Sequence, residues 1–479
     1  MLCVSGAVAV FKDELNDWVD GMVRAPAAVP PLDQAMARLR AGLPAGQRPR
    51  RLELPTASRG YELRSQEGLR LRLDAAGGVV VMEASHGIAD FLVNYHTRLF
   101  MGHPGRWFIG AAGLLLLASI ITGVLMHRRI LRHLFTLRLR PDNPRLAYAD
   151  SHKAAGVWGL PFHILVAVTG AWLGLYGLLA PEWAGPAPPP GPAKPCGTAP
   201  GLECLVAETR RAIPGFVPVF VDFGKGGDTV AVRGDLPGRL FRRHEAGVVF
   251  DLETGRATAV DAPALVSTAR RVDLAMAPLH FGDYAGVAVQ GLYAVLGLLG
   301  AGLSITGVLM WSRRGHARQR RRRLATARIL CAAAGGNGVA TFALPLLAVG
   351  AAAGMGPGFS GSMRLGDLFR PEVAPVLPVF LVLWVAAGLF LLRAPGLRDM
   401  AARTLAIIGL LCLAAPAAAM ALRLHAGLPP GDVLRDGVSV ALWLGGAVAL
   451  LGAWYLGAGR EGLGRRVSSV APPSSTDWA

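Results

Sequence analysis

The chain has 479 residues; 52% of them are hydrophobic, only 17% are charged, and the mean hydropathy is +0.41. This composition is too apolar for a soluble protein of that length and indicates a polytopic α-helical membrane protein. Membrane proteins gather lysine and arginine at the cytoplasmic ends of their helices, so the net charge of +17 requires no nucleic-acid partner.

A short apolar stretch, MLCVSGAVAVF, occupies residues 1–11. It is too short to cross a bilayer, which takes about 20 residues, and no basic segment of a signal peptide precedes it. Because VSGAVAVF resembles the ends of later apolar runs, we interpret 1–11 as the outer part of a truncated first transmembrane helix whose start lies upstream or whose initiator is misassigned. The alternative is a short interfacial segment, with export depending on the next helix.

Two polar segments, 12–95 and 181–279, are each expected to fold as a small α+β module outside the membrane. Each contains an amphipathic stretch that predicts a helix, at 34–43 and at 204–213. Alternation of apolar and polar residues predicts strands, which are 50–55, 61–65, 69–74 and 78–83 in the first segment and 217–223, 229–234 and 247–260 in the second. A proline-rich stretch at 186–195 indicates an extended linker.

Seven apolar runs are long enough to cross a bilayer, and they lie at 107–126, 154–179, 285–311, 328–352, 375–393, 402–423 and 438–457. Basic residues cluster after the first and third runs, in 127–153 and in 313–328, the latter with eight arginines and no acid. Alternating spans place both stretches and the C-terminus on one side, which the excess of arginine marks as the cytoplasm. The expected divisions are 1–11, 12–95, 96–180 with helices two and three, 181–279, 280–315 with helix four, and a four-helix extension with a cytoplasmic tail at 316–479.

Two stretches of the chain are nearly identical, namely IITGVLMHRR at 120–129 and SITGVLMWSRR at 304–314. A histidine lies 26 residues before each Thr-Gly pair, and these histidines are His96 and His280. Glycines also occur at matching offsets, namely Gly102, Gly113, Gly286 and Gly297. This spacing indicates a duplicated unit of helix, module and helix, followed by four further helices whose sequences predict no chemistry.

Five of the eleven histidines stand at positions that suggest a function. His96 and His280 precede the second and fourth helices at the outer surface. His127 and His152 lie at the cytoplasmic ends of the second and third helices. His163 lies about ten residues into the third helix, where an ionisable side chain marks a functional site by default. On one straight helix, His152 and His163 would share a face and lie about 16 Å apart along the axis.

The residues alone leave three interpretations of these histidines open. They could be transient ligands in metal-ion transport, they could hold b-type haem through two neutral imidazoles from different helices, or the outer ones could be interfacial anchors with His163 a packing residue. Haem requires close helix approach, which nearby small residues permit; these are Gly102, Gly113, Gly156, Gly159, Gly170, Gly286 and Gly297. We interpret the threonines of the Thr-Gly pairs as helix–helix contacts that bond to their own helix; these are Thr122, Thr169 and Thr306.

The remaining motifs narrow the chemistry. The chain has no CxxCH motif, which argues against covalent c-type haem. The glycine-rich stretch 224–228 lacks the spacing of a dinucleotide fingerprint, so an electron donor would be external. Cys196 and Cys204 lie in one outer segment, where a disulfide can form, and the sequence leaves the bridged and the free states open. The other cysteines are expected to be apolar packing residues, namely Cys3, Cys331 and Cys412.

Several stretches, in the correct order, resemble the PepSY-associated transmembrane helix family. They are VSGAVAVFKDELNDWV at 4–19, HRRILRHLFTLR at 127–138, DSHKAAGVWGLPFHILVAVTGA at 150–171 and LHFGDYAGVAVQGLYAVLGLLGAGLSITGVLMW at 279–311. The resemblance covers about 1–315 and implies PepSY-like modules at about 30–85 and 200–262. The family includes iron-regulated bacterial inner-membrane proteins, among them ferric-siderophore reductases that use b-type haem.

This resemblance implies a set of haem ligands. His96 and His280 would hold haem b on the periplasmic side. His152, with His163 and His127, would serve a second haem b on the cytoplasmic side of the full-length protein. The family's first helix carries a further histidine, before the point at which this chain begins.

The resemblance also implies a function, which is haem-dependent reduction of a ferric siderophore or another iron chelate during iron uptake. Electrons would come from quinol or another external donor, and the partners would include membrane lipid but no nucleic acid. The PepSY-like modules would lie in the periplasm and the C-terminus in the cytoplasm. Two alternatives stay open, namely a non-enzymatic PepSY-type sensor or protease-modulating protein, and a metal or siderophore transporter.

Overall fold

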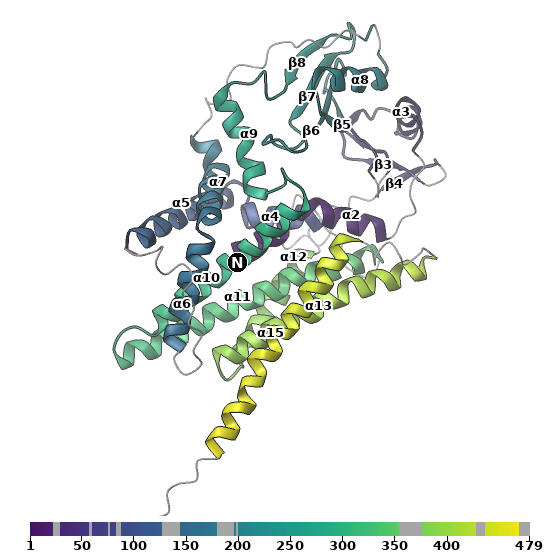
Figure 1. The fold of residues 1–479 in the computed structure, drawn as a ribbon. Helices are drawn as coiled ribbons and strands as arrows, with labels where there is room; N and C mark the ends of the chain where they lie inside the picture. The colour runs from purple at the N-terminus through teal and green to yellow at the C-terminus, as the bar shows by residue number, and fades with distance from the viewer. Residues whose placement is uncertain are drawn as a thin grey trace, which may run out of the picture. The chain divides into compact units, whose positions relative to one another are not determined.

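The computed structural model describes residues 1–22, 29–56, 60–74, 77–82, 88–126, 144–179, 196–197, 200–353, 376–427 and 436–468. They form two compact units, one made of residues 2–307 and the other of 308–353 and 376–468. Figure 1 shows the order of helices and strands along the chain. The first unit contains the five histidines that the sequence singles out.

Within the described residues, eight strands of the first unit form one antiparallel sheet in the order β4-β3-β2-β1-β5-β6-β7-β8. Their bounds are β1 Pro49–Glu53, β2 Glu62–Ser65, β3 Arg70–Leu73, β4 Val79–Met82, β5 Val217–Phe223, β6 Thr229–Asp235, β7 Ala246–Asp251 and β8 Ala257–Asp261. The predicted strands are therefore present. The stretch 247–260 contains parts of two strands, which a turn joins.

The two polar segments contribute to one continuous sheet, because β1 pairs with β5 and places Leu52 opposite Val221. Each segment also supplies one helix, α3 at Leu32–Ala41 and α8 at Leu202–Ala212. Both helices pack on the same face of the sheet around a shared apolar core (Figure 1). Asp33 in α3 accepts a hydrogen bond of 2.6 Å from the backbone N–H of Leu202. The first segment thus caps the helix of the second.

The opposite face of the sheet is charged. Arg51 forms a two-point ion pair with Asp222, with distances of 2.6 and 2.9 Å. Glu62 is only 2% exposed and pairs with Arg70 at 2.7 Å and with Arg72 at 2.9 Å. A carboxylate can be buried at this depth because several guanidinium groups surround it.

The helices that follow the two modules are each broken by a turn shortly after a histidine. These helices are α4 Ile88–Arg98 with α5 His103–Met126, and α9 Thr268–Phe281 with α10 Val287–Ser312. At the breaks, Gly102 and Gly286 have φ values of 66° and 78°, which favour glycine. Within the described residues, no neighbouring atom lies within 4 Å of a side chain built on either one. The prediction that these two glycines permit close helix contact was therefore wrong; they permit turns.

The predicted third helix is bent. It consists of α6 Pro144–Trp158 and α7 Leu160–Leu179, and its two halves meet at an angle of 67°. The prediction of one straight helix through His152 and His163 was therefore wrong, since the bend at Gly159 lies between them. Pro161, two residues after Gly159, is the local signal for this break, because proline is favoured in the first turn of a new helix.

Among the described residues, five helices are long and apolar enough to cross a membrane, judged by length and composition. They are α5, α10, α11 Ala317–Ala352, α13 Leu397–His425 and α15 Gly437–Ser468. The bent pair α6–α7 makes a sixth, and α12 Val376–Leu392 is a shorter apolar helix. The chain is thus a polytopic helical membrane protein, as its composition predicts. Two short helices, α1 Leu2–Ala9 and α2 Lys12–Met22, begin it.

The second unit packs α11, α12, α13 and α15 closely. A side chain on Gly336 would lie 2.5 Å from the carbonyl oxygen of Trp384, so glycine is needed where α11 crosses α12. Arg328 donates to the backbone carbonyls of Leu392 and Ala394 and so satisfies the C-terminal end of α12. The described contacts give this unit a packing role and no reactive cluster.

Candidate functional site

His96 and His280 are brought together from distant parts of the chain. They lie near the ends of α4 and α9, and their ring centroids are 6.1 Å apart with ring planes inclined by 40°. Burial lowers the pKa of His96 to about 4 and, together with repulsion from His96, lowers that of His280 to about 3. Both imidazoles are therefore neutral near pH 7, which is the form that binds a metal.

The short helix α1 positions His96. Its Ser5 is fully buried, and Ser5 Oγ lies 3.1 Å from Nδ1 of the imidazole. A methyl group on the neighbouring Gly6 would lie 2.8 Å from Cε1 of the same ring. Glycine at this position therefore allows α1 to press against the histidine.

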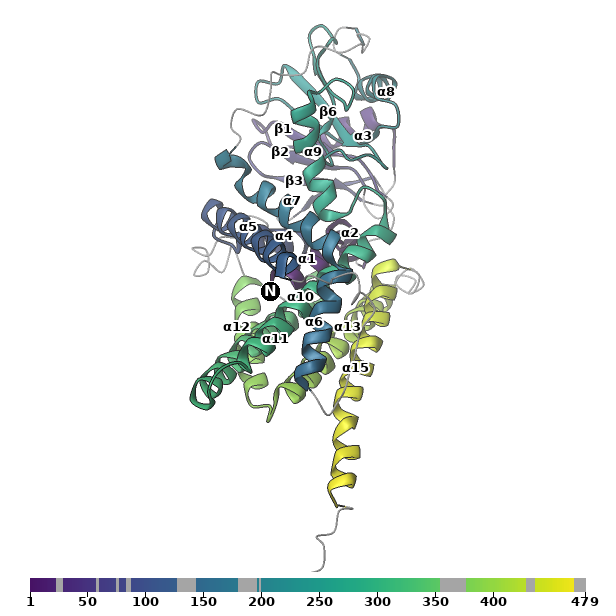
Figure 2. The ribbon, with the colours of Figure 1, turned by 60° about the vertical axis from the view of Figure 1, so that its left-hand side comes forward.

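The helix α7 positions His280 in the same way. Thr169 is 1% exposed, and its Oγ1 lies 2.8 Å from Nδ1 of His280. A methyl group on Gly170 would lie 3.2 Å from Cε1 of that ring. Figure 2 shows α1, α4, α7 and α9, the four helices that carry these residues.

His152 in α6 faces α10. Its Nδ1 lies 3.0 Å from the carbonyl oxygen of Leu303 and 3.1 Å from Oγ1 of Thr306. A methyl group on Gly307 would lie 3.3 Å from Cε1 of the ring. A Thr-Gly pair thus contacts this histidine as well.

His163 in α7 is 5% exposed and lies against another part of α10. A methyl group on Gly300 would lie 3.2 Å from its Nε2. Among the described residues, none provides a hydrogen-bond partner for Nε2. A buried ring nitrogen without a partner is a candidate metal ligand.

The five predicted histidines therefore differ in what the structure shows. His96 and His280 form a ring pair. His152 and His163 meet α10 near Gly307 and Gly300, two turns and about 10 Å apart along that helix. His127 lies outside the described residues.

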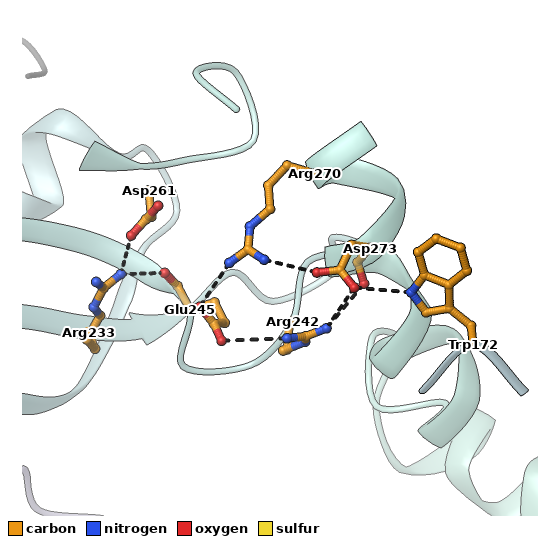
Figure 3. Close-up of polar contacts among 7 residues, drawn as sticks. All are labelled: Trp172, Arg233, Arg242, Glu245, Asp261, Arg270 and Asp273. Atoms are coloured by element: carbon orange, nitrogen blue, oxygen red, sulfur yellow. Dashed lines mark hydrogen bonds and ion pairs between the residues drawn. The ribbon is translucent and has the colours of Figure 1, made fainter. Parts of the chain in front are cut away.

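A buried carboxylate ties the helix of His280 to the sheet and to α7. Asp273 lies two turns before His280 and is 2% exposed. It accepts hydrogen bonds from Trp172 Nε1 at 3.1 Å, from Arg242 at 3.2 Å and from Arg270 at 3.0 Å. Figure 3 shows Asp273 at the centre of these three donors. This network fixes α9 to α7 close to the contact between Thr169 and His280.

The same network continues into the sheet. Glu245 lies within 3.8 Å of Arg242 and 3.6 Å of Arg270. Arg233 donates to the backbone carbonyl of Glu245 at 2.8 Å and to Asp261 at 2.5 Å (Figure 3). The loop between β6 and β7 therefore clamps the sheet to α9.

A second charged cluster lies beside the C-terminal end of α9. Arg243 forms ion pairs with Asp13 in α2 and, at 3.0 Å, with Asp235. The Lys12 ammonium lies 4.8 Å from the centroid of the Phe281 ring. Burial raises the pKa of Asp283, which Lys12 and Arg243 oppose only in part. The cluster surrounds the residues that directly follow His280.

Sequence reasoning missed the residues that hold the histidines. Thr169 and Thr306 were interpreted only as helix contacts, and their bonds to their own helices are present. Ser5 was not singled out, although it also bonds to its own helix. Thr306 lies in ITGV, Thr169 in VTGA and Ser5 in VSGA. The recurring pair of a hydroxyl residue and a glycine was therefore the sequence signal that could have identified these three residues. Asp273 gave no local signal, because its partners are distant in sequence.

The donor set near His96 and His280 fits a haem. Imidazole nitrogen binds a metal at about 2.0 Å, so two imidazoles on opposite sides of one iron hold their ring centroids roughly 6 Å apart. The observed separation is 6.1 Å. In the described part of the chain, three or more histidine, cysteine or acidic side chains do not gather as a site for a bare metal ion. His96 and His280 are the residues that would hold a haem here, through their neutral imidazoles.

Comparison with known proteins adds a family relationship. The sequence pattern of the PepSY-associated TM region matches residues 1–314. A protein of Pseudomonas aeruginosa, described as uncharacterised, is 33% identical over 399 residues, which cover 76% of this chain and 94% of that protein. The family match over residues 1–314 includes both sheet-forming segments and every histidine discussed above.

Proposed function

The chain belongs to the PepSY-associated transmembrane family, and on this premise we propose that it is a b-haem electron-transfer protein of the bacterial inner membrane. Its substrate would be a ferric siderophore or another ferric chelate, reduced on the periplasmic side during iron uptake. The chain would then be a haem-dependent ferric-chelate reductase.

The contact between His96 and His280 carries this proposal. The two imidazoles are neutral, come from different helices and have the separation that one iron requires. Glycines at the contacting positions of α1 and α7 leave the rings no bulky neighbour on that side. An interfacial anchor would need none of these features.

The inner site would use the remaining histidines. His152, with His163 and His127, would serve a second haem b near the cytoplasmic face. The buried Nε2 of His163 supports a ligand role on this side. When bound, b-type haem supplies one-electron transfer. The chain's own residues would hold it and orient the imidazoles.

The orientation follows from charge. The arginine-rich stretch 313–328 would face the cytoplasm together with the C-terminus. The segments 12–95 and 181–279, which build the sheet, would then lie in the periplasm and cover the outer histidines. The Cys196–Cys204 disulfide supports this side, since disulfides persist in oxidising compartments. Quinol in the membrane, or another external donor, would supply the electrons.

Alanine variants of the outer pair test the proposal. His280→Ala and His96→Ala should each remove the bis-imidazole spectrum of the outer haem. His103→Ala is a matched control, because His103 is exposed at the start of α5. Haem retained with bis-histidine ligation in His280→Ala would contradict the ligand assignment. A folded protein that takes up no haem would instead favour a PepSY-type sensor or a transporter.

A further inference from the structure

We propose that three hydroxyl–glycine dipeptides are histidine receptors, which fix the imidazole proton on Nδ1 and leave Nε2 free to bind iron. The receptors are Ser5–Gly6 for His96, Thr169–Gly170 for His280 and Thr306–Gly307 for His152. The role of Nε2 rests on the proposed haem function. The position of the proton is a property of the chain alone.

The hydroxyl groups determine the direction of the hydrogen bonds. A hydroxyl has one proton to donate. Thr169 donates it to the carbonyl of Leu165 at 2.7 Å, and Ser5 donates to the carbonyl of Leu2 at 3.1 Å. Thr306 bonds back to its own helix in the same way. Each hydroxyl oxygen can then only accept from the imidazole, so Nδ1 must carry a hydrogen.

A backbone carbonyl gives the same result independently for one of the rings. A carbonyl oxygen accepts hydrogen bonds and cannot donate them. Nδ1 of His152 lies 3.0 Å from the carbonyl oxygen of Leu303. A neutral imidazole has one N–H, so Nε2 of His152 keeps its lone pair.

The glycines bring the hydroxyls within reach. Methyl groups on Gly6, Gly170 and Gly307 would lie 2.8, 3.2 and 3.3 Å from Cε1 of the facing rings. Cε1 lies between the two ring nitrogens, so each glycine faces the same edge of its histidine. One dipeptide therefore supplies a hydrogen-bond acceptor for Nδ1 and the space for the adjoining ring edge.

A fourth dipeptide, Thr122–Gly123, provides a built-in comparison. Thr122 bonds to the carbonyls of Ala118 and Ser119 at 3.0 Å, as the receptor hydroxyls bond to their own helices. Nothing in the described part of the chain lies within 4 Å of a side chain built on Gly123. Thr122 thus shares the local chemistry of the receptors, and among the described residues no histidine lies against it.

The proton position can be measured without haem. The free histidine side chain prefers the Nε2–H form in water, so a receptor must reverse this preference. Nitrogen-15 NMR of histidine-labelled, haem-free protein in nanodiscs should show the Nδ1–H form for His96, His152 and His280. Single His→Ala variants assign the signals. The Nε2–H form at any of the three in the wild-type chain would overturn the proposal.

Substitution of a receptor hydroxyl tests its cause. Thr169→Val keeps the shape of the side chain and removes the acceptor, so the ratio of Nδ1–H to Nε2–H at His280 should fall about tenfold. Thr169→Ser should restore it. Thr122→Val is the matched control and should leave all three rings unchanged. An unchanged ratio in Thr169→Val, or the same change in Thr122→Val, would contradict a receptor role.

Haem titration then separates this proposal from the proposed function. Thr169→Val should weaken haem binding about 10- to 100-fold, as loss of an outer hydrogen bond to a ligand histidine does in metal sites. Thr122→Val should bind haem as the wild-type chain does, and any equal loss would contradict the receptor role. A wild-type chain that binds no haem would overturn the proposed function, whereas the NMR result on the receptors would stand.

Discussion

Replacing Asp273 with asparagine should loosen α9, the helix that carries His280. The carboxylate accepts hydrogen bonds from Arg242 and Arg270 and is itself 2% exposed. Asparagine has nearly the same shape and can still accept from Trp172. The substitution therefore removes mainly the charge that holds Arg242 against α9 and pairs with Arg270 within the helix.

The size of the effect follows from these contacts. A hydrogen bond to a charged group contributes about 1.5–3 kcal/mol. The Arg242 and Arg270 side chains are 29% and 26% exposed, so solvent screening reduces this contribution. Two screened contacts give a loss of about 2–4 kcal/mol for local opening of α9. This corresponds to a roughly 30- to 700-fold rise in the population of the open helix.

Hydrogen–deuterium exchange measures that opening directly. Amides of α9 and of residues 239–245 should exchange faster in Asp273→Asn by about this factor, while strands β2 and β3 stay protected. Asp261→Asn is the matched control, because Asp261 pairs with Arg233 within the sheet network and does not contact α9. Exchange of α9 that rises less than about threefold, or equally in both variants, would refute the clamp.

Three further substitutions have definite expected outcomes. Gly6→Ala places a methyl group 2.8 Å from Cε1 of His96, so haem affinity should fall about 10-fold or more. Gly123→Ala, whose methyl group has no atom of the described residues within 4 Å, should bind haem normally. Equal affinities of the two variants would contradict the packing argument. Asp283→Asn should raise the stability of the folded protein at pH 7. Because the pKa of Asp283 is raised in the folded state, the folded protein binds more protons than the unfolded chain between pH 3.8 and that raised pKa. The stability of the wild-type protein therefore falls as the pH rises through this range. The two proteins should become equally stable below pH 3.8, and an advantage that persists there would show another cause. Cys196→Ser removes the Cys196–Cys204 disulfide, whose cysteines are 8 residues apart in the sequence. The free energy of unfolding of the sheet should fall by about 2–3 kcal/mol, which denaturant titration measures. An unchanged denaturation midpoint would contradict this contribution.

The sheet could be predicted from sequence because its signal is local. Alternation of apolar and polar residues, as in LRLRLD at 69–74, places every second side chain on one face and so predicts a strand. The pairing of β1 with β5 could not be predicted in this way. It joins Leu52 to Val221 across most of the first unit, and nothing near either residue specifies its partner.

The candidate site could be predicted only in part from the sequence. The repeat and the family resemblance selected His96 and His280 together, and the structure places their rings in contact. The breaks at Gly102 and Gly159 were missed, although Pro104 and Pro161, two residues after each glycine, are local signals for the start of a new helix. The links from Asp273 to Trp172 and Arg242 connect residues about 101 and 31 positions apart, so only the folded chain reveals them.

The most direct test of the central claim is an optical spectrum of the detergent-purified protein, oxidised and then reduced with dithionite, with haem quantified per chain. The account predicts at least one haem b per chain, with the sharp reduced bands of bis-imidazole ligation. In His280→Ala, the absorbance that belongs to the outer haem should be lost. A well-folded preparation that stays free of haem when haem is supplied would contradict it.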